Sequence, residues 1–468
     1  MKNISIWKDI ESKSYPTLDE DKEVDVLIIG GGITGISSLY HLKDSNLKVM
    51  LVEQNKIGYG VTGNSTGKLN YLQNDLIDKI RKSFNDDTAS KYLKSQIDAI
   101  NMVVDIINKE KIDCDLVKVK GILYTNKVNE IKKIKDLELF LKENNIEVNT
   151  TYNKLVQSKY MIEVDNTYLF HPLKFIYGLL KNNKYPIYEN TSIKALEKKK
   201  DYFISYTDKY KIKSKYVILA LHYPYFNLPY LFPIKGTLEK SYLSASKYSG
   251  NDVSIISYSN PFISIRTYQD KLIYLSNSHS TSNNVSDKHH FEELIKKLNG
   301  LKLKPNYLWS NIDIITNDGL PYIGEIKNNL LIGTGYNTWG LATSVLSSKI
   351  LSDIILVKDN EYVKLFDPKR VNISQVTGSL KCAYSSFEGI VNGLADKNEK
   401  VTYDEVDGKD VMIYRDSRKH IVNHKCPHFG CRLIFNEIEK TWDCPCHGSR
   451  FDIDGKCING PSNHDIGI

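Results

Sequence analysis

Cysteine and histidine side chains gather toward the C-terminal end of this chain in a spacing that suits metal binding. Cys426 and His428 form a C-x-H pair, and Cys444 and His447 form a C-x-x-H pair further along. Two thiolates and two imidazoles can hold a tetrahedral zinc ion. The same set can instead hold the two irons of a [2Fe–2S] cluster, with the thiolates on one iron and the imidazoles on the other. The spacing therefore predicts a metal centre.

The residues around these four favour iron over zinc. Each half carries an additional cysteine, Cys431 or Cys446, and the second half is followed by GSRFDIDGK. CPHFGC together with WDCPCHGSRFD closely resembles the Rieske [2Fe–2S] family. The resemblance assigns the cluster to Cys426, His428, Cys444 and His447, and it implies a disulfide between Cys431 and Cys446. Cys457 has no partner in the motif.

Two further side chains bear on the reduction potential of the predicted cluster. By the same resemblance, the hydroxyl of Ser449 donates a hydrogen bond to a cluster sulfur, and Phe451 stands where high-potential members carry tyrosine. A missing donor destabilises the reduced, more negative cluster. We therefore expect a potential in the middle of the Rieske range, which spans about −150 to +300 mV.

A glycine-rich turn near the other end of the chain predicts a dinucleotide site. GGGITG, residues 30–35, fits G-x-G-x-x-G and lies between an apolar, strand-like stretch and a helical one. Gly30 permits the tight turn, Gly32 lets the backbone approach a pyrophosphate, and Gly35 lets helix and strand pack closely. Glu53 closes the next strand, where a carboxylate can accept hydrogen bonds from ribose hydroxyls. The residues predicted to bind the nucleotide here are Gly30, Gly32, Ile33, Thr34, Gly35 and Glu53.

A second stretch shows why context matters for this motif. GYGVTG, residues 58–63, also fits G-x-G-x-x-G. No strand precedes it at the right spacing, so it is predicted to be a loop.

The elements that must position these groups can be read from hydrophobic periodicity. Residues 24–29 and 48–53 are predicted strands, and residues 75–150 are predicted to be mostly helical with charged faces. Strands prevail from about residue 160 to residue 305, and residues 330–356 suggest a strand, a glycine turn and a helix. Beyond a linker, short strands with turn signals and no long helix indicate a small all-β domain.

Four blocks in the first part of the chain resemble one superfamily in the expected order. DVLIIGGGITGISSLYHL looks like the N-terminus of the D-amino-acid-oxidase-like FAD-dependent oxidoreductases, and GYGVTGNSTGKLN resembles their stretch that passes the flavin ring. HPLKFIYGLL, YENTSI and KYVILALHYP resemble the middle segments. DGLPYIGE with LLIGTGYNTWGLATSVLSSKILSDII resembles the C-terminal FAD block. The resemblance implies FAD, with Ile193 near the adenine and Gly335 and Gly340 near the flavin.

The expected fold class is an α/β FAD-binding Rossmann-like domain with an interleaved α+β substrate domain, plus a small all-β Rieske domain at the C-terminus. The oxidoreductase body is expected over residues 1–365. Its FAD-binding parts are about 20–75, 160–225 and 305–357, and its substrate or cap regions are about 76–160 and 226–305. Residues 366–374 are the predicted linker, and residues 375–468 are the predicted Rieske domain.

As a whole, the chain resembles bacterial D-amino-acid-oxidase-like FAD proteins with a C-terminal Rieske domain, and LFDPKR matches their junction. The resemblance implies an oxidoreductase in which FAD oxidises a small amine or amino-acid-like substrate and electrons leave singly through the cluster. A reductase fed through the cluster is the first alternative. An electron-transfer protein without its own organic substrate is the second. The expected partners are a small-molecule substrate and a redox protein or small electron acceptor or donor.

Fewer residues are candidates for contact with the flavin ring or the substrate than for binding the cofactors. Lys68, in TGKL, is predicted to approach the flavin ring and stabilise its anionic form, although a solvated loop lysine explains it equally well. Arg266, in FISIRTY, could bind a substrate carboxylate in bidentate fashion. His222 and His279 are weaker candidates. The resemblance departs at SNSH, residues 276–279, where many relatives have a glycine pair before a histidine.

Bulk properties exclude some other classes. The formal net charge is +7, but lysines are spread along the chain among acidic residues, which disfavours nucleic-acid binding. No run of about 18 apolar residues predicts a membrane span. The first residues contain no apolar stretch typical of a signal peptide, so a cytoplasmic location is the expectation.

Overall fold

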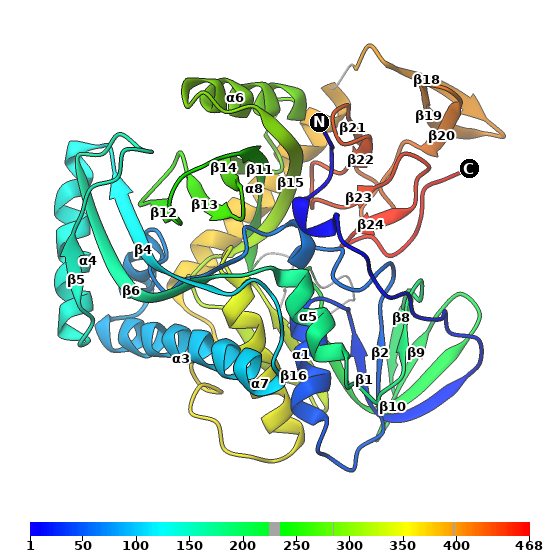
Figure 1. Ribbon diagram of the computed structural model, residues 1–468. Coiled ribbons are helices and arrows are strands. Elements are labelled where there is room, and N and C mark those ends of the chain that lie inside the picture. The colour runs from blue at the N-terminus through cyan, green and yellow to red at the C-terminus, as the bar shows by residue number, and fades with distance from the viewer. Residues whose placement is uncertain (224–234, 284, 396–397) are drawn as a thin grey trace.

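The computed structural model describes residues 1–223, 235–283, 285–395 and 398–468. Two large sheets lie in the body of the molecule, and a small β module that carries the C-terminus lies beside them (Figure 1). The N-terminal segment, with the short 3₁₀ helix η1 (Ile6–Lys8), lies beside this module in Figure 1. Both ends of the chain therefore lie near this module (Figure 1).

The first sheet carries the glycine-rich turn. Its strands run in the order β16 (Tyr322–Lys327), β17 (Leu330–Thr334), β10 (Lys211–Leu219), β1 (Lys22–Ile29), β2 (Val49–Val52) and β7 (Ile187–Tyr188). A hairpin of β8 (Ala195–Lys198) and β9 (Phe203–Tyr206) continues from β10. β1 pairs in parallel with β2 and β10, which suits its uninterrupted buried run from Val26 to Ile29.

Helices cover one face of this sheet and join it to the rest of the body. α1 (Ile33–Leu42) packs against α7 (Gly340–Ile355) and α5 (Pro172–Leu180), and α3 (Asp86–Glu110) packs on α7. The predicted helices at residues 75–150 are α2 (Leu76–Ser83), α3 and α4 (Ile131–Glu143). The second stretch that fits G-x-G-x-x-G, residues 58–63, forms turns and the 3₁₀ helix η2 (Thr62–Asn64), so its prediction as a loop is confirmed.

The second sheet forms the other wall of the body. Its order is β15 (Pro305–Thr316), β11 (Gly236–Lys247), β14 (Lys271–Ser280), β13 (Ser264–Tyr268), β12 (Ser254–Ser257), β4 (Val117–Thr125), β6 (Tyr160–Leu169) and β3 (Lys68–Leu69), with β5 (Val148–Thr150) on β6. α6 (Asp287–Gly300) packs on β11 and β14, and η3 (Val128–Glu130) precedes α4. The loop of residues 53–67 leads from β2 of the first sheet to β3 of the second, so this loop bridges the two sheets.

The C-terminal module consists of two small sheets. One contains β18 (Val401–Val406), β19 (Lys409–Arg415) and β20 (Lys419–Asn423). The other contains β21 (Ile434–Asn436), β22 (Thr441–Asp443), β23 (Arg450–Phe451) and β24 (Cys457–Asn459). Both are antiparallel, as the predicted short strands require.

The segment before this module differs from the prediction. α8 (Ile373–Ala395) is a long helix, so the expectation of short strands and no long helix from about residue 375 is wrong. Its serines and glycines are weak helix formers, which hid it from a propensity argument. Tertiary contact explains them: a Cβ on Gly389 would lie 2.7 Å from the Pro445 carbonyl oxygen, and one on Gly393 would lie 2.8 Å from that of Arg432.

A buried group of charged side chains fastens the module to the body. Lys240 of β11 lies 2.8 Å from Asp287 and 2.6 Å from Asp443 of the module. Arg450 binds Asp443 at 3.1 Å and Glu439 at 2.8 Å. Because each charge is paired, the protein avoids the free-energy cost of burying an isolated charge. Among the helices that the structure describes, none has both the length and the apolar character to cross a bilayer.

Candidate cofactor sites

At the predicted nucleotide turn, the backbone makes the close approaches that the glycine motif predicts. Gly30 has φ +112°, and a Cβ there would lie 2.4 Å from the Ala220 carbonyl oxygen. A Cβ on Gly35 would lie 1.9 Å from the carbonyl oxygen of Gly30. Gly32 precedes α1 as its N-cap and makes no side-chain cap. The Ile33 N–H donates to Thr62 Oγ1 at 3.2 Å, and Gly32, Ile33 and Thr34 line the cavity, so the N-terminus of α1 faces it.

A cavity of about 570 Å³ opens at this turn. Such a volume lies within the range of cofactor sites. Seven of the nine residues predicted to bind FAD line it, and so does Lys68. The seven are Gly30, Gly32, Ile33, Thr34, Glu53, Ile193 and Gly340.

The other two predicted FAD residues, Gly35 and Gly335, are not part of the cavity wall. Gly335 has φ +72°, and a Cβ there would lie 2.6 Å from Thr316 Cγ2. Gly335 therefore serves the turn between β17 and α7, and its flavin contact stays a prediction. Gly35 brings α1 onto β1, as its place in the motif predicts.

Glu53 occupies the end of β2, where the ribose partner is expected. Its carboxylate accepts hydrogen bonds from the backbone N–H groups of Gly31 and Asn55, each at 2.8 Å. Burial raises the pKa of Glu53 above its usual value. These bonds hold the carboxylate at the cavity wall, and its contact with a ribose stays a prediction.

Lys68 is buried, so the alternative of a solvated loop lysine is wrong. Its Nζ donates to the Ile255 carbonyl oxygen at 2.8 Å. Desolvation, with the Arg266 charge adding to it, holds the pKa of Lys68 well below its usual value. Lys68 is thus a buried donor in the cavity wall, and its approach to the flavin stays a prediction.

Arg266 has a different role from the one that the sequence suggests. It is buried, it is not part of the cavity wall, and its guanidinium donates to the backbone carbonyl oxygens of Gly67, Thr267 and Phe170. Gly67 has φ +74°, and a Cβ there would lie 2.5 Å from Arg266 Nη1. Arg266 therefore holds the loop before Lys68 in place, an arrangement that does not suit a clamp for a substrate carboxylate.

The four predicted metal ligands come together between two loops of the module. The rings of His428 and His447 lie 5.0 Å apart, and the Nδ1 atoms of both are buried without a hydrogen-bond partner. Burial lowers the pKa of each to about 4, which keeps both imidazoles neutral. A hydrogen bond from Cys444, with backbone amides adding to it, lowers the pKa of Cys426 to about 7. Two neutral imidazoles and two neighbouring thiols, of which Cys426 has a lowered pKa and Cys444 a raised one, fit a [2Fe–2S] cluster.

A disulfide joins Cys431 and Cys446 across these loops. Both residues are buried. We expect alkylation under native conditions, followed by mass spectrometry, to modify neither sulfur, because neither is a thiol and neither is exposed. Modification of both without prior reduction would reject the bridge in solution. Reduction under unfolding conditions before alkylation is the positive control.

The predicted potential depends on the surroundings of Ser449 and Phe451. Ser449 is buried, hydrogen-bonds the sulfur of Cys426 and accepts the Ser462 N–H at 2.9 Å, and Phe451 is fully buried. Phe451→Tyr should raise the midpoint potential by roughly 40 mV, because one hydrogen bond worth about 1 kcal/mol stabilises the reduced cluster. Ser449→Ala should lower it by a similar amount. A redox titration followed by electron paramagnetic resonance (EPR) measures both shifts, and a parent potential near the upper limit of the Rieske range would contradict the prediction.

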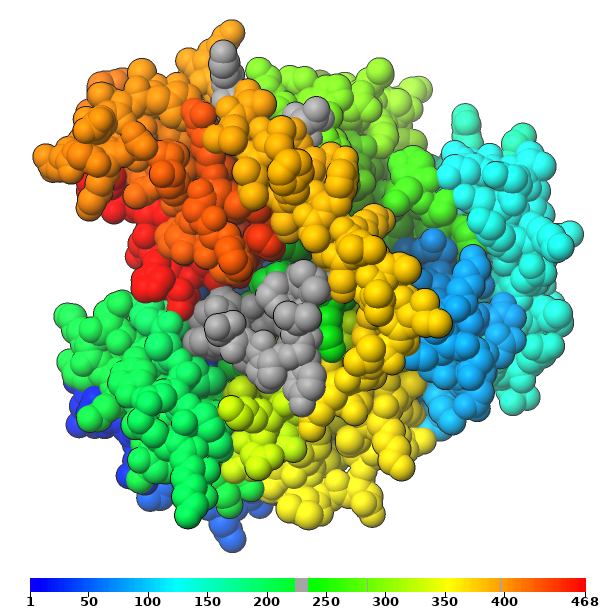
Figure 2. Space-filling view, turned by 180° about the vertical axis from the view of Figure 1, so that it is seen from behind, coloured from blue at the N-terminus to red at the C-terminus, as the bar shows by residue number. Residues whose placement is uncertain are grey.

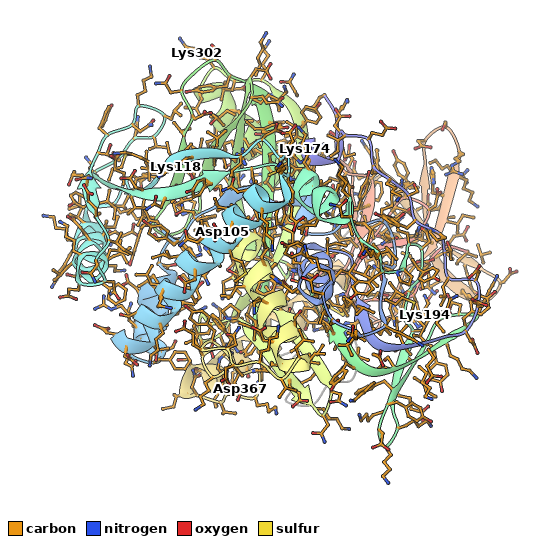
Figure 3. The ribbon with its side chains drawn as sticks, turned by 60° about the horizontal axis from the view of Figure 1, so that its bottom comes forward. Asp105, Lys118, Lys174, Lys194, Lys302 and Asp367 are labelled. Atoms are coloured by element: carbon orange, nitrogen blue, oxygen red, sulfur yellow. A yellow bond between two sulfur atoms is a disulfide. The ribbon has the colours of Figure 1, made fainter. Side chains whose placement is uncertain are left out.

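The C-terminal module forms part of the cavity wall. Nothing in the sequence indicated this contact. The module residues on the wall are Glu439, Thr441, Arg450, Asp452, Lys456, Ile458, Asn459 and Gly460. Asn55 Nδ2 donates to the Cys457 carbonyl oxygen at 2.9 Å, and Asn463 Nδ2 donates to those of Ile193 and Lys194 at 3.1 and 3.0 Å (Lys194 is labelled in Figure 3). The module thus closes the end of the cavity where the adenine is predicted. A local sequence motif cannot predict contacts between positions so far apart in the chain.

Two adjacent residues after β10 connect the cavity with the metal site. His222 and Tyr223 both line the cavity, and the Nε2 atom of His222 is buried without a hydrogen-bond partner. The Tyr223 ring lies 6.5 Å from that of His428 and 6.4 Å from that of His447. One side chain therefore lies beside both predicted cofactor sites.

Asp313 is a further cavity residue that the sequence did not reveal. It lies directly opposite Glu239 in the ladder between β11 and β15. Burial, with the Glu239 carboxylate adding to it, raises the pKa of Asp313 to about 7. Two carboxyl groups facing each other in this way disfavour ionisation of both.

The raised pKa of Asp313 predicts how the stability of the folded protein depends on pH. A raised folded-state pKa means that the folded protein binds the proton more tightly, so stability falls as pH rises from about 3.8 to about 7. The melting temperature of Asp313→Asn relative to the parent should therefore be clearly higher at pH 8 than at pH 5. Asp270→Asn, at an exposed carboxylate whose pKa is lowered, is the control and should not show this rise. An equal difference at both pH values for Asp313→Asn would contradict the assignment.

Comparison with protein families identifies the class that this fold and these two sites define. The model of the FAD dependent oxidoreductase family matches residues 25–354, and the model of the Rieske [2Fe-2S] domain matches residues 392–467. This chain belongs to the FAD-dependent oxidoreductase family and carries a C-terminal Rieske domain. The predicted fold class and both predicted cofactors are thereby confirmed.

Particular relatives agree with this assignment. The chain is 30% identical over 492 residues to the putative Rieske 2Fe-2S iron-sulfur protein YhfW of Bacillus subtilis, covering 97% of this chain and 95% of that protein. It is 35% identical over 101 residues to gamma-glutamylputrescine oxidoreductase of Escherichia coli, covering 22% and 24% of the two chains. Glycine oxidase from Geobacillus kaustophilus shares the fold with a TM-score of 0.64 at 16% identity, covering 75% of this chain and 99% of that chain.

Proposed function

We propose that this protein oxidises a small amine or amino-acid-like substrate in the FAD cavity and passes the electrons, one at a time, through the Rieske centre to an external acceptor. FAD accepts a hydride when bound, and a [2Fe–2S] cluster carries single electrons. The residues of the chain would hold the two groups, exclude water and bring the two sites together.

The observation that carries this proposal is the wall shared by the cavity and the metal site. Tyr223 lines the cavity and lies within 6.5 Å of both cluster histidine rings, measured between ring centroids. His447 Nε2 lies 3.2 Å from the hydroxyl of Ser386, on α8. The cluster histidines are therefore directed at the oxidoreductase body, which suits electron exchange within one chain.

An external acceptor would have a separate approach. Phe429 is exposed, and its ring lies 4.3 Å from that of His428 and 5.4 Å from that of His447. An exposed aromatic side chain in contact with both ligands offers an apolar contact for a redox protein or a small electron carrier.

Within the proposed substrate range, the cavity favours an amine over an amino acid. Arg266, the candidate partner for a carboxylate, is bound to backbone carbonyl oxygens instead. Arg450, on the cavity wall, is bound to Asp443 and Glu439. Asp313 offers a carboxyl group that can accept a hydrogen bond from an amine.

The test is anaerobic incubation of the purified holoprotein with panels of amines and amino acids. Flavin bleaching followed by the EPR signal of the reduced cluster would support the proposal. Bleaching by amino acids alone would overturn the preference for amines. No bleaching by any compound, together with reoxidation of the chemically reduced protein by an imine or enone, would favour a reductase instead.

A substitution at Tyr223 tests electron transfer to the cluster separately from substrate oxidation. Tyr223→Leu should leave flavin bleaching intact and slow the appearance of the reduced cluster, because it removes the ring between the two sites. Tyr403→Leu, at an exposed position on β18, is the matched control. Equal rates of cluster reduction in both variants would show that Tyr223 is not part of the route.

A further inference from the structure

The long helix before the Rieske module exposes an apolar stripe. Along α8, apolar residues recur every three or four positions, as in a heptad repeat. The large members of the stripe are exposed by fractions that run from 44% at Ile390 to 84% at Ile373. The stripe consists of Ile373, Val376, Leu380, Ala383, Tyr384, Phe387, Ile390, Val391 and Leu394. We call these nine residues the α8 seam.

The opposite side of α8 explains why the seam faces outward. Gln375 Nε2 donates to Asp318 at 2.9 Å, and Asn392 Nδ2 donates to the Ser282 carbonyl oxygen at 2.7 Å. Ser386, Gly389 and Gly393 contact the module through small side chains or none. The helix is therefore fixed to its own chain by polar and small residues, the reverse of the usual pattern for a surface helix.

The size of the seam is that of a protein interface. Its large side chains leave on the order of 900 Å² exposed, if a fully exposed large apolar side chain presents roughly 150–200 Å². A standard interface buries about 800 Å² per partner. α8 crosses the surface from the body to the module, yellow to orange in Figure 2, so the seam is open along its length. Isolated exposed apolar residues are ordinary, but a continuous patch of this size marks an interaction site.

We propose that the α8 seam is the contact between two copies of this chain, which pair through α8 as a two-helix coiled coil. A helix whose a and d positions are all apolar finds its complement in the same stripe of a second copy. Ile373, Leu380, Phe387 and Leu394 occupy the a positions, and Val376, Ala383 and Ile390 occupy the d positions. Self-complementary pairing of this kind closes as a dimer with two-fold symmetry.

The composition of α8 disfavours a membrane surface as the occupant. Helices that lie in a bilayer interface usually carry many lysines and arginines on their polar face. Lys381 is the basic residue that α8 contains, and Glu388 is its acidic one. The polar face is in any case occupied by the body and the module.

The primary test is the mass of the full-length holoprotein in solution, by light scattering and sedimentation over a range of concentrations. We expect a dimer for the parent at micromolar concentration and a monomer for Leu380→Glu/Phe387→Glu. Val128→Glu changes an equally exposed apolar residue on η3, outside the seam, and should stay dimeric. The flavin spectrum and the EPR signal of the cluster should be unchanged in both variants, which excludes unfolding as the cause.

Cysteine cross-linking locates the contact. Ala383→Cys, at a d position, should form an intermolecular disulfide under mild oxidation, and Lys381→Cys, exposed outside the a and d positions, should cross-link much more slowly. A parent protein that is monomeric at all concentrations would overturn the proposal. So would a double variant that remains dimeric, or a monomeric parent that floats with phosphatidylglycerol–phosphatidylcholine vesicles.

Discussion

Cys444→Ser should abolish the iron–sulfur centre and leave the FAD site intact. Cys444 lies 18 positions after Cys426, on the second ligand loop. Its backbone N–H binds the Ser449 carbonyl oxygen at 2.8 Å, which holds it facing the first loop. Serine is a poor substitute because a thiolate is the ligand that the cluster requires. We expect iron and acid-labile sulfide to fall to near zero, with FAD content unchanged.

The loss should also be visible in the stability of the module. Metal binding is coupled to folding in small domains that assemble their ligands from loops. The module should therefore unfold at a lower temperature, ahead of the body. Iron and sulfide analysis with EPR spectroscopy, flavin absorbance and calorimetry measure the three consequences.

A matched cysteine in the same module provides the control. Cys457 is buried, and its sulfur lies 3.1 Å from the Ser462 carbonyl oxygen, a contact that a serine hydroxyl can also make. Cys457→Ser should keep full iron content. If Cys444→Ser retained iron and the EPR signal, the ligand assignment would be wrong. If the parent protein contained zinc in place of iron and sulfide, the zinc alternative would be the correct one.

Gly35→Ala should strongly weaken FAD binding. The added Cβ would lie 1.9 Å from the carbonyl oxygen of Gly30, and that oxygen belongs to the backbone of the nucleotide turn, which cannot rotate away. Either α1 moves from β1 or the turn opens, and both changes displace the helix N-terminus that faces the cavity. A cost of about 3 kcal/mol, at the upper end for overpacking, corresponds to roughly a hundredfold weaker binding.

A glycine away from the cavity provides the matched control. A Cβ on Gly300, the last residue of α6, would meet no atom within 4 Å, and Gly300 does not line the cavity. Gly300→Ala should therefore bind FAD like the parent. Flavin fluorescence on titration of the apoprotein gives both affinities. Equal affinities for Gly35→Ala and the parent would show that this turn does not hold the cofactor.

Several structural features followed from short stretches of sequence. The strand, turn and helix around residues 30–35 have the predicted order, and Gly30 and Gly35 make the close approaches that their motif requires. CPHFGC and WDCPCHGSRFD place the four predicted ligand side chains on two loops that meet. In both cases a few neighbouring residues encode the local backbone geometry and the chemistry together.

Other features could not be predicted because they depend on burial. Arg266 and Lys68 looked equally available as charged residues, yet Arg266 is enclosed by carbonyl oxygens and Lys68 lines the cavity. α8 was missed because its glycines and serines oppose helix formation locally, and contacts with the module outweigh that preference.

By itself, the sequence determined the two cofactors and predicted which residues would hold the cluster and which turn would receive the nucleotide. Those properties depend on side-chain type and on spacing over a few residues. The tertiary structure decided that the module closes the cavity at the glycine-rich turn, that Tyr223 lies beside both predicted cofactor sites and that α8 exposes an apolar stripe. Each of these depends on which distant segments become neighbours, and that is set by the packing of the whole chain.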